Sequence, residues 1–145
     1  MATERRRGRS ATPEERREFL ESNRLAIVGL ERRSGSPALT PVYYVLDGDD
    51  LLMSTTNTRQ KYRSIKANPR VSVCVMSEEF PFIYLTIYGR AVVEESVEAA
   101  TDLWMSIMGV MYGQKPGEEQ RPEVEEIVRS QGRVVVRFTP ESYAG

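Results

Sequence analysis

The chain has 145 residues, which is room for one domain of ordinary size. Its 20 lysines and arginines nearly balance 21 aspartates and glutamates, so the molecule lacks the basic excess of a nucleic-acid-binding protein. It contains no histidine, which excludes Ser-His-Asp and Cys-His catalysis, Cys/His zinc sites and histidine-ligated haem. If the protein is an enzyme, the missing acid–base residue points to a cofactor as the carrier of the chemistry.

Apolar runs and cysteine content indicate the compartment. No apolar run approaches the roughly 18 residues of a membrane span, and no apolar stretch follows the N-terminal arginines as it does in a signal peptide. The single cysteine, Cys74, cannot form an internal disulfide, which fits a reducing environment. We therefore expect a cytoplasmic protein without a membrane partner.

Residues 1–11 are expected to form a disordered basic tail, because they are rich in arginine and almost free of apolar side chains. The tail is either a solvated terminus or a basic arm for an anionic partner. Nucleic acid is not expected as that partner, since no stacking platform accompanies the arginines. A single domain is predicted over residues 12–145, opening with a helix that Thr12, Pro13 and Glu15 start through a capping box.

The next part of the chain has the pattern of strands separated by turns, such as the hairpin turn at Asp47-Gly48. Their spacing predicts a mainly β fold with helices (α+β) around a six-stranded antiparallel barrel, closed or half-closed. The expected strands are residues 25–30, 38–46, 51–55, 71–76, 83–93 and 133–138.

Two helices are expected between the strands, and a third near the end. Residues 58–67 form the first, which Asn68-Pro69 stops. Residues 97–112 form the second, whose apolar stripe is either core or subunit contact, or alternatively a ligand surface. Residues 113–122 are predicted as a loop and 123–129 as a short helix. The stripe consists of Ala100, Leu103, Trp104, Ile107 and Met111.

Charge is distributed unevenly along the chain. No acidic residue occurs from Leu51 to Ser77, although this stretch holds several cations. Arg59 and Lys61 fall in the first helical turn, where free N–H groups and the helix dipole favour negative charge. The hydroxyl-rich segment before them completes a pattern that is typical of a phosphate site, with a purely structural basic helix as the alternative. The cations are Arg59, Lys61, Arg63, Lys66 and Arg70.

The segment Thr58-Arg59-Gln60-Lys61-Tyr62-Arg63-Ser64-Ile65-Lys66-Ala67-Asn68-Pro69-Arg70-Val71 resembles the cofactor-phosphate segment of the split β-barrel flavin and deazaflavin oxidoreductases. That superfamily includes the pyridoxamine 5′-phosphate oxidase-like proteins and their F420-dependent relatives. The resemblance extends over about residues 12–143. The other matching segments, in the family's order, are 25–28, 35–37, 40–44, 47–49, 52–55, 88–93 and 133–141.

This resemblance implies a homodimer of split β-barrels of the FMN-binding type, with two cofactors at the subunit interface. Lys61 would bind the cofactor phosphate, helped by Arg59, Arg63 and the neighbouring Gln60. Aromatic side chains between Phe80 and Tyr84 would approach the ring from the partner. The hydroxyls of Ser54, Thr55 and Thr56 would line the same pocket, and the backbone of Pro41, Val42 and Tyr43 would run along the ring system.

The cofactor that the resemblance favours is coenzyme F420, with FMN as the alternative. The Arg-x-Lys-x-Arg spacing at residues 59, 61 and 63 is more similar to the F420-dependent branch, because the oxidases place an arginine where this chain has Gln60. F420 carries a phosphodiester and an oligoglutamate tail, and this negative charge suits the basic segment.

The activity implied is that of an F420H2-dependent reductase, which transfers a hydride to a small conjugated or quinone-like substrate. No catalytic side chain and no metal ligand is assigned. Tyr43, Tyr44, Tyr84 and Tyr88 are candidate proton donors, and packing is the alternative role for each. The alternatives to the reductase are an FMN-dependent oxidase or reductase of the pyridoxamine phosphate oxidase-like group, and a non-catalytic F420- or flavin-binding protein.

Overall fold

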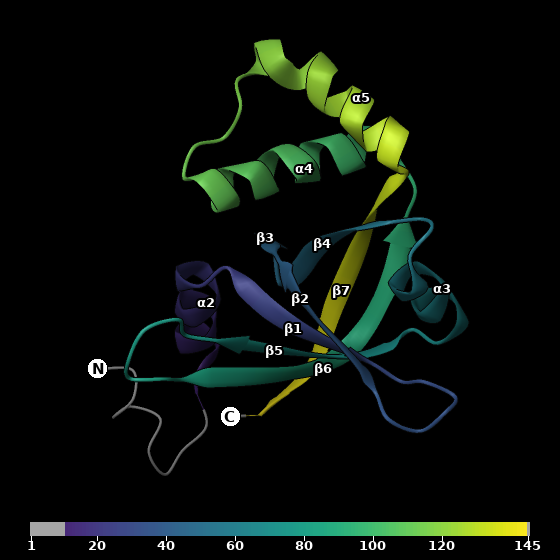
Figure 1. Cartoon of the computed structure of the whole chain (residues 1–145). Coiled ribbons are helices and arrows are strands. Elements are labelled where there is room, and N and C mark those ends of the chain that lie inside the picture. The colour runs from purple at the N-terminus through teal and green to yellow at the C-terminus, as the bar shows by residue number, and fades with distance from the viewer. Residues whose placement is uncertain (1–10, 145) are drawn as a thin grey trace.

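The computed structural model describes residues 11–144 and confirms a mixed α+β fold built on one curled antiparallel sheet (Figure 1). The sheet order is β2-β1-β5-β6-β7-β4-β3. The predicted tail, residues 1–11, lies outside the described residues apart from Ala11. The strands are β1 (Leu25–Leu30), β2 (Ala38–Tyr43), β3 (Val45–Asp47), β4 (Asp50–Thr56), β5 (Arg70–Met76), β6 (Tyr84–Glu94) and β7 (Arg133–Ala144). The helices are α2 (Pro13–Ser22), α3 (Gln60–Ala67), α4 (Val97–Tyr112), α5 (Arg121–Gln131) and the 3-10 turn η1 (Glu118–Gln120).

The predicted second strand is two strands in the structure, which makes the sheet seven-stranded rather than six-stranded. β2 pairs with β1 at one edge of the sheet, whereas β3 pairs with β4 at the other. The chain passes between the two edges at Tyr44, whose buried hydroxyl donates to the Leu20 carbonyl at 2.6 Å. The sequence does not show which edge of the sheet an apolar segment joins, so residues 38–46 were predicted as one strand and the break at Tyr44 was not predicted. Because consecutive residues join the two edges, the sheet curls into a half-barrel.

The interior of the half-barrel is the main hydrophobic core. Alternate residues of each strand point into it, as the buried positions of β4 and β5 show. α2 begins with the predicted capping box on Thr12 and buries Leu20 against this core. The largest fully buried side chains in the interior are Val28, Leu51, Met53, Val73, Val75, Leu85, Ile87, Val136 and Phe138.

Helices α4 and α5 form a second layer, stacked beyond the β4–β7 side of the sheet (Figure 1). The apolar stripe of α4 packs with Val128 of α5 and Val135 of β7, so its interpretation as core is confirmed. α5 begins at Arg121 rather than at 123, because Pro122 lies in the first helical turn, where proline is favourable. None of the described helices is long and apolar enough to cross a membrane.

Candidate functional site

The candidate site lies where β4 ends and α3 begins. The helix starts at Gln60, two residues later than predicted, and Arg59 is its N-cap residue. No side chain caps the helix start, and its first turn holds no acidic residue. The free N–H groups and the positive end of the helix dipole therefore meet cations instead of the expected anions.

Lys61 is buried at this helix start, with 8% of its surface exposed. In the described part of the chain its ammonium group has no hydrogen bond and no ion pair. Burial, and then the positive charge of Arg59, lowers the pKa of Lys61 to about 8. Because an unpaired buried charge is costly, this position is unfavourable for folding and favourable for binding an anion.

A third cation, Arg133, reaches the same region from the start of β7. β4 and β7 are paired so that Arg133 lies opposite Thr56, and its Nη1 donates to Ser54 Oγ at 3.1 Å. Burial, and then the charge of Arg59, lowers the pKa of Arg133. Among the described residues, neither arginine has an acidic partner. Arg133 was not among the residues predicted for this site, because only the pairing of β4 with β7 brings it to β4.

The hydroxyl side chains of β4 divide between the two faces of the strand. Ser54 and Thr56 lie on the same face as Arg133, and Thr56 Oγ1 is 3.2 Å from Thr58 Oγ1. Thr55 points to the opposite face, where its Oγ1 is fully buried and without a hydrogen-bond partner among the described residues. The pleat of the strand thus separates Thr55 from the other two hydroxyls. The structure therefore does not bring the three hydroxyls together in one pocket, because Thr55 faces the core.

Gln60 and Arg63 lie on the solvent-exposed side of the first turn of α3. Arg63 is exposed, and its guanidinium donates to the Thr58 carbonyl at 3.2 Å and to Gln60 Oε1 at 3.1 Å. Pro41, Val42 and Tyr43 lie on β2, a strand that also contacts β4. No interaction of the described side chains joins these three residues to Lys61 or Arg59.

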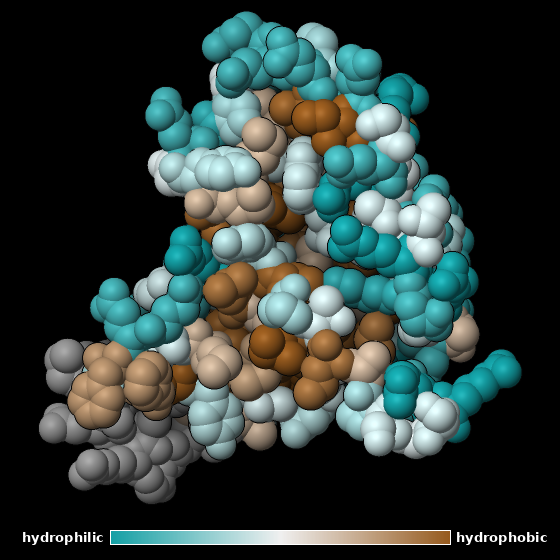
Figure 2. Space-filling view, viewed as in Figure 1, coloured by the Kyte–Doolittle hydropathy of each residue, from teal (hydrophilic) through white to brown (hydrophobic). Residues whose placement is uncertain are grey.

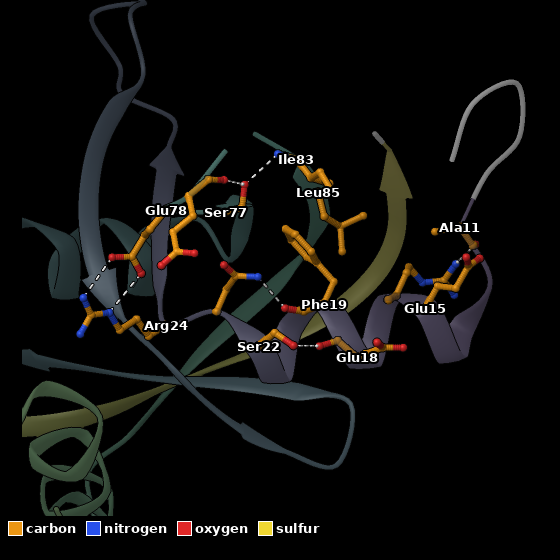
Figure 3. Close-up of a pocket in the computed structure, with 13 residues that line it drawn as sticks. Ala11, Glu15, Glu18, Phe19, Ser22, Arg24, Ser77, Glu78, Ile83 and Leu85 are labelled. Atoms are coloured by element: carbon orange, nitrogen blue, oxygen red, sulfur yellow. Dashed lines mark hydrogen bonds and ion pairs between the residues drawn. The ribbon is translucent and has the colours of Figure 1, made fainter. Parts of the chain in front are cut away.

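Two cavities of the described residues lie away from this helix start. The larger, of about 750 Å³, is between α2 and the segment after β5 (Figure 3). Its rim includes Glu18, Glu78 and Glu79, and Arg24 is already bonded to Glu78 at 3.0 Å. An acidic rim repels a phosphate, so the geometry favours the α3 start as the anion site. The second cavity, of about 590 Å³, opens on the outer side of β1 and β5.

The candidate proton donors differ in their surroundings. Tyr44 is 3% exposed, and burial raises its pKa well above the ordinary tyrosine value. Its hydroxyl is bonded to a backbone carbonyl, so we assign Tyr44 a structural role. Tyr84 and Tyr88 on β6 are 56% and 47% exposed.

In the described residues, no three potential metal-ligating His, Cys, Asp or Glu side chains gather at one point.

Solved structures share the architecture of this chain. A conserved hypothetical protein from Mycobacterium tuberculosis matches with a TM-score of 0.82 and 22% identity, over 95% of this chain and 86% of that one. An F420 reductase matches with a TM-score of 0.68 and 24% identity, over 88% and 94% of the two chains. A FAD-binding protein from Mesorhizobium loti matches with a TM-score of 0.69 and 20% identity, over 93% and 94%. At these identities the likeness shows the fold, which is the split β-barrel.

The family is shown by sequence. The model of the pyridoxamine 5′-phosphate oxidase family matches residues 12–144. The chain therefore belongs to the pyridoxamine 5′-phosphate oxidase family, and the resemblance to this family over about residues 12–143 is confirmed. None of the curated proteins compared with this chain matches it.

Proposed function

We propose that the protein is an F420H2-dependent reductase that transfers a hydride to a small conjugated or quinone-like substrate. One observation carries the proposal: Lys61 is a buried cation without an anionic partner at a helix start, and Arg59 adds a second positive charge beside it. A phosphate group of a ligand would supply the missing partner.

The residues present fit such a phosphate. Lys61 and Arg59 would neutralise its charge, and the free N–H groups of α3 would donate to its oxygens. The backbone of Pro41–Tyr43 would lie along the ring. When bound, reduced F420 supplies the hydride, and this chain has to hold the ring against the substrate and exclude water.

F420 is preferred to FMN for two reasons. Gln60 stands where the oxidases have an arginine next to the phosphate-binding lysine. In addition, a structural neighbour named as an F420 reductase shares the fold over 88% of this chain, which supports the choice. An FMN-dependent oxidase or reductase and a non-catalytic F420- or flavin-binding protein are the alternatives that the experiments below separate.

A homodimer with the cofactors at its interface is part of the proposal. The side of β1, β2, β5 and β6 that faces away from the core, here called the outer sheet face, carries no charged residue over its central positions. In Figure 2, hydrophobic side chains gather below α4, over β1 and β2. Large exposed apolar patches on a folded protein mark interaction sites. The central positions are Leu25, Ile27, Leu39, Pro41, Ser72, Cys74, Met76, Tyr84, Thr86 and Tyr88.

The location proposed is the cytoplasm, where the single thiol of Cys74 stays reduced. The substrate is a small molecule, because the hydride has to pass between two rings held in contact.

The proposal is tested by titrating the purified protein with F420 and, separately, with FMN, followed by the fluorescence of each ligand. Tight F420 binding with little FMN binding supports the proposal, and turnover of F420H2 with quinones and nitro compounds then separates a reductase from a binding protein. Tight FMN binding alone supports the FMN-dependent alternative. If neither ligand binds, the proposed function is wrong.

The Lys61→Ala variant tests the site itself. We expect its affinity for the phosphate-bearing cofactor to fall about tenfold to a hundredfold, because a charge-assisted hydrogen bond is lost. Lys66→Ala is the matched control, since Lys66 lies on the same helix but is exposed and paired with Glu95 at 3.2 Å. Unchanged affinity in Lys61→Ala would contradict the phosphate assignment.

A further inference from the structure

We propose that Arg133 is a further anion-binding residue of this site and that Trp104 is the residue that positions it. The inference rests on the proposed function, because it assigns a second ligand to the same phosphate. It goes beyond the basic segment of residues 59–63, since both residues come from other parts of the fold.

The position of Arg133 is fixed on three sides. Its Nη1 donates to Ser54 Oγ at 3.1 Å, and its Nε donates to Gln131 Oε1 at 2.7 Å. Its guanidinium carbon Cζ lies over the Trp104 ring of α4, 3.7 Å from the ring centre. A long side chain held in this way loses little further freedom on binding a ligand, so its affinity is pre-organised.

Some N–H groups of Arg133 are free to donate hydrogen bonds to a ligand. A guanidinium carries five N–H groups, and the two bonds named above leave both N–H groups of Nη2 without a partner among the described residues. Such a fork matches two oxygens of one phosphate. A guanidinium with a purely structural role would be expected to pair with an acid, and in the described chain no acid does so.

The electrostatics of Arg133 connect it to the rest of the site. Arg59 opposes the positive charge of both Lys61 and Arg133, so it lies within electrostatic reach of each. Arg59 thus links the cation on α3 to the cation on β7, and in the described chain none of the three is paired with a carboxylate. An anion placed among them relieves repulsion with all three, whereas an anion bound by Lys61 and Arg59 alone leaves Arg133 uncompensated.

Trp104 acts through Arg133 rather than on the ligand. The face of an indole attracts a cation, and the stack holds the guanidinium where Ser54 can receive its hydrogen bond. The indole itself packs against the cluster of Leu103, Val128 and Val135. α4 thereby supports the anion site without contributing a charge to it.

The experiment compares each cofactor with a version that lacks the phosphate: FMN with riboflavin, and F420 with the same deazaflavin stripped of its phosphate and tail. We expect Arg133→Gln to weaken binding of the phosphate-bearing member about tenfold to a hundredfold and to leave the phosphate-free member unchanged. Arg133→Lys should recover part of the lost affinity, because lysine keeps the positive charge but lacks the two parallel N–H donors of a guanidinium. Arg129→Gln on α5, an exposed arginine that loses the same charge, is the control and should change neither.

Trp104 is tested by a double-mutant cycle. Trp104→Leu alone should weaken binding of the phosphate-bearing member about threefold to tenfold. In an Arg133→Gln background the same change should cost nothing more, because Trp104 then has no cation to hold. Equal and additive losses would show that Trp104 acts independently, which would overturn its positioning role.

Each failure has its own signature. If the wild type binds neither F420 nor FMN, the proposed function fails and the inference fails with it. If the wild type binds a phosphate-bearing cofactor and Arg133→Gln binds it equally well, only the inference is wrong. If Arg133→Gln loses the phosphate-free ligand to the same extent, Arg133 is a structural residue, which also overturns the inference.

Discussion

Lys61 is the residue at which folding and binding make opposite demands. Its side chain is mostly buried, and its ammonium has no hydrogen bond or ion pair in the described chain, which destabilises the ligand-free protein. We expect Lys61→Met to raise the thermal midpoint of the free protein by about 2–4 °C, since the apolar stem is kept and the charge is removed. The same variant should bind the phosphate-bearing cofactor about tenfold to a hundredfold more weakly.

Calorimetry and a cofactor titration on one preparation measure both effects. Lys66→Met is the control: its cation is exposed, so neither the midpoint nor the affinity should change appreciably. A lower midpoint in Lys61→Met would mean that Lys61 stabilises the fold, and the interpretation of its position as a binding site would be wrong.

Lys61 should also make both the free energy of unfolding and the cofactor affinity depend on pH. The pKa of Lys61 is about 8 in the folded chain and 10.5 as its ordinary value, so between these pH values the unfolded state binds more protons. The contribution of Lys61 to the free energy of unfolding therefore rises from pH 8 to pH 10.5. Phosphate affinity should change in the opposite direction, being constant below pH 8 and falling above it, because the neutral amine cannot pair with an anion.

Denaturant unfolding measures how the free energy of unfolding changes between pH 7 and 9.5, and cofactor titration measures how the affinity changes over the same range. In Lys61→Met the part of each pH dependence that comes from Lys61 should disappear, which distinguishes Lys61 from other titrating groups. An affinity in the wild type that stays level through pH 9 would contradict the assignment of Lys61 to the phosphate.

At the scale of elements, α3 presents the site, and eight residues are too few for a helix to be stable alone. It is held by Ile65, which is 3% exposed in the main core, and by Glu95, which accepts hydrogen bonds from Tyr62 and Lys66. We expect Ile65→Ala to lower the free energy of unfolding by about 2–5 kcal/mol, through lost burial and a cavity. Glu95→Ala should leave it nearly unchanged, because exposed ion pairs contribute little.

Denaturant unfolding measures the difference, and amide exchange of residues 60–67 shows whether the helix itself loosens. An effect of Glu95→Ala as large as that of Ile65→Ala would mean that polar contacts, rather than burial, fix the site.

Most elements were predictable because their causes are local. The capping box at Thr12 and Glu15 starts α2 as predicted, and Asn68-Pro69 ends α3. The exceptions have long-range causes. The break at Tyr44 depends on which edge each strand joins, and β7 continues to Ala144 because it pairs with Thr86 of β6. Its last residues are mostly exposed, so no apolar pattern indicated a strand there.

The same distinction applies to the site. Lys61 and Arg59 were predictable, because cations at a helix start break a local electrostatic rule. Arg133 was not, since the register of β4 on β7 is what brings it opposite Thr56. Ser54, Thr55 and Thr56 were predicted to line one pocket. Because side chains alternate between the two faces of a strand, Thr55 points away from the other two.

At the scale of the whole molecule, the outer sheet face is arranged like a protein interface. Leu39, Ser72 and Tyr88 border one shallow cavity of about 590 Å³, and Leu39 and Tyr88 are 67% and 47% exposed. Arg70 and Arg90 lie at its rim, where Arg90 pairs with Glu141 at 3.5 Å. An apolar centre with a charged rim is the usual composition of a protein contact surface.

A second copy of this chain is the partner that we predict for the outer sheet face. Wild-type protein should have twice the 16.5 kDa mass of the chain by light scattering. Leu39→Glu should shift it to the monomer, since burying a carboxylate in an apolar interface carries a large desolvation cost. The control is Ile127→Glu on α5, also an exposed aliphatic residue but outside this face, which should remain dimeric.

Cofactor binding then decides whether the dimer completes the site. The start of α3 borders neither the cavity of about 750 Å³ nor that of about 590 Å³, and we expect the partner to supply a second wall for a cofactor held there. If the partner supplies that wall, monomeric Leu39→Glu should bind F420 or FMN at least tenfold more weakly than the wild type, although Lys61 and Arg59 are untouched. A monomer that binds its cofactor with undiminished affinity would place the whole site within one chain, and the interface would then serve stability alone.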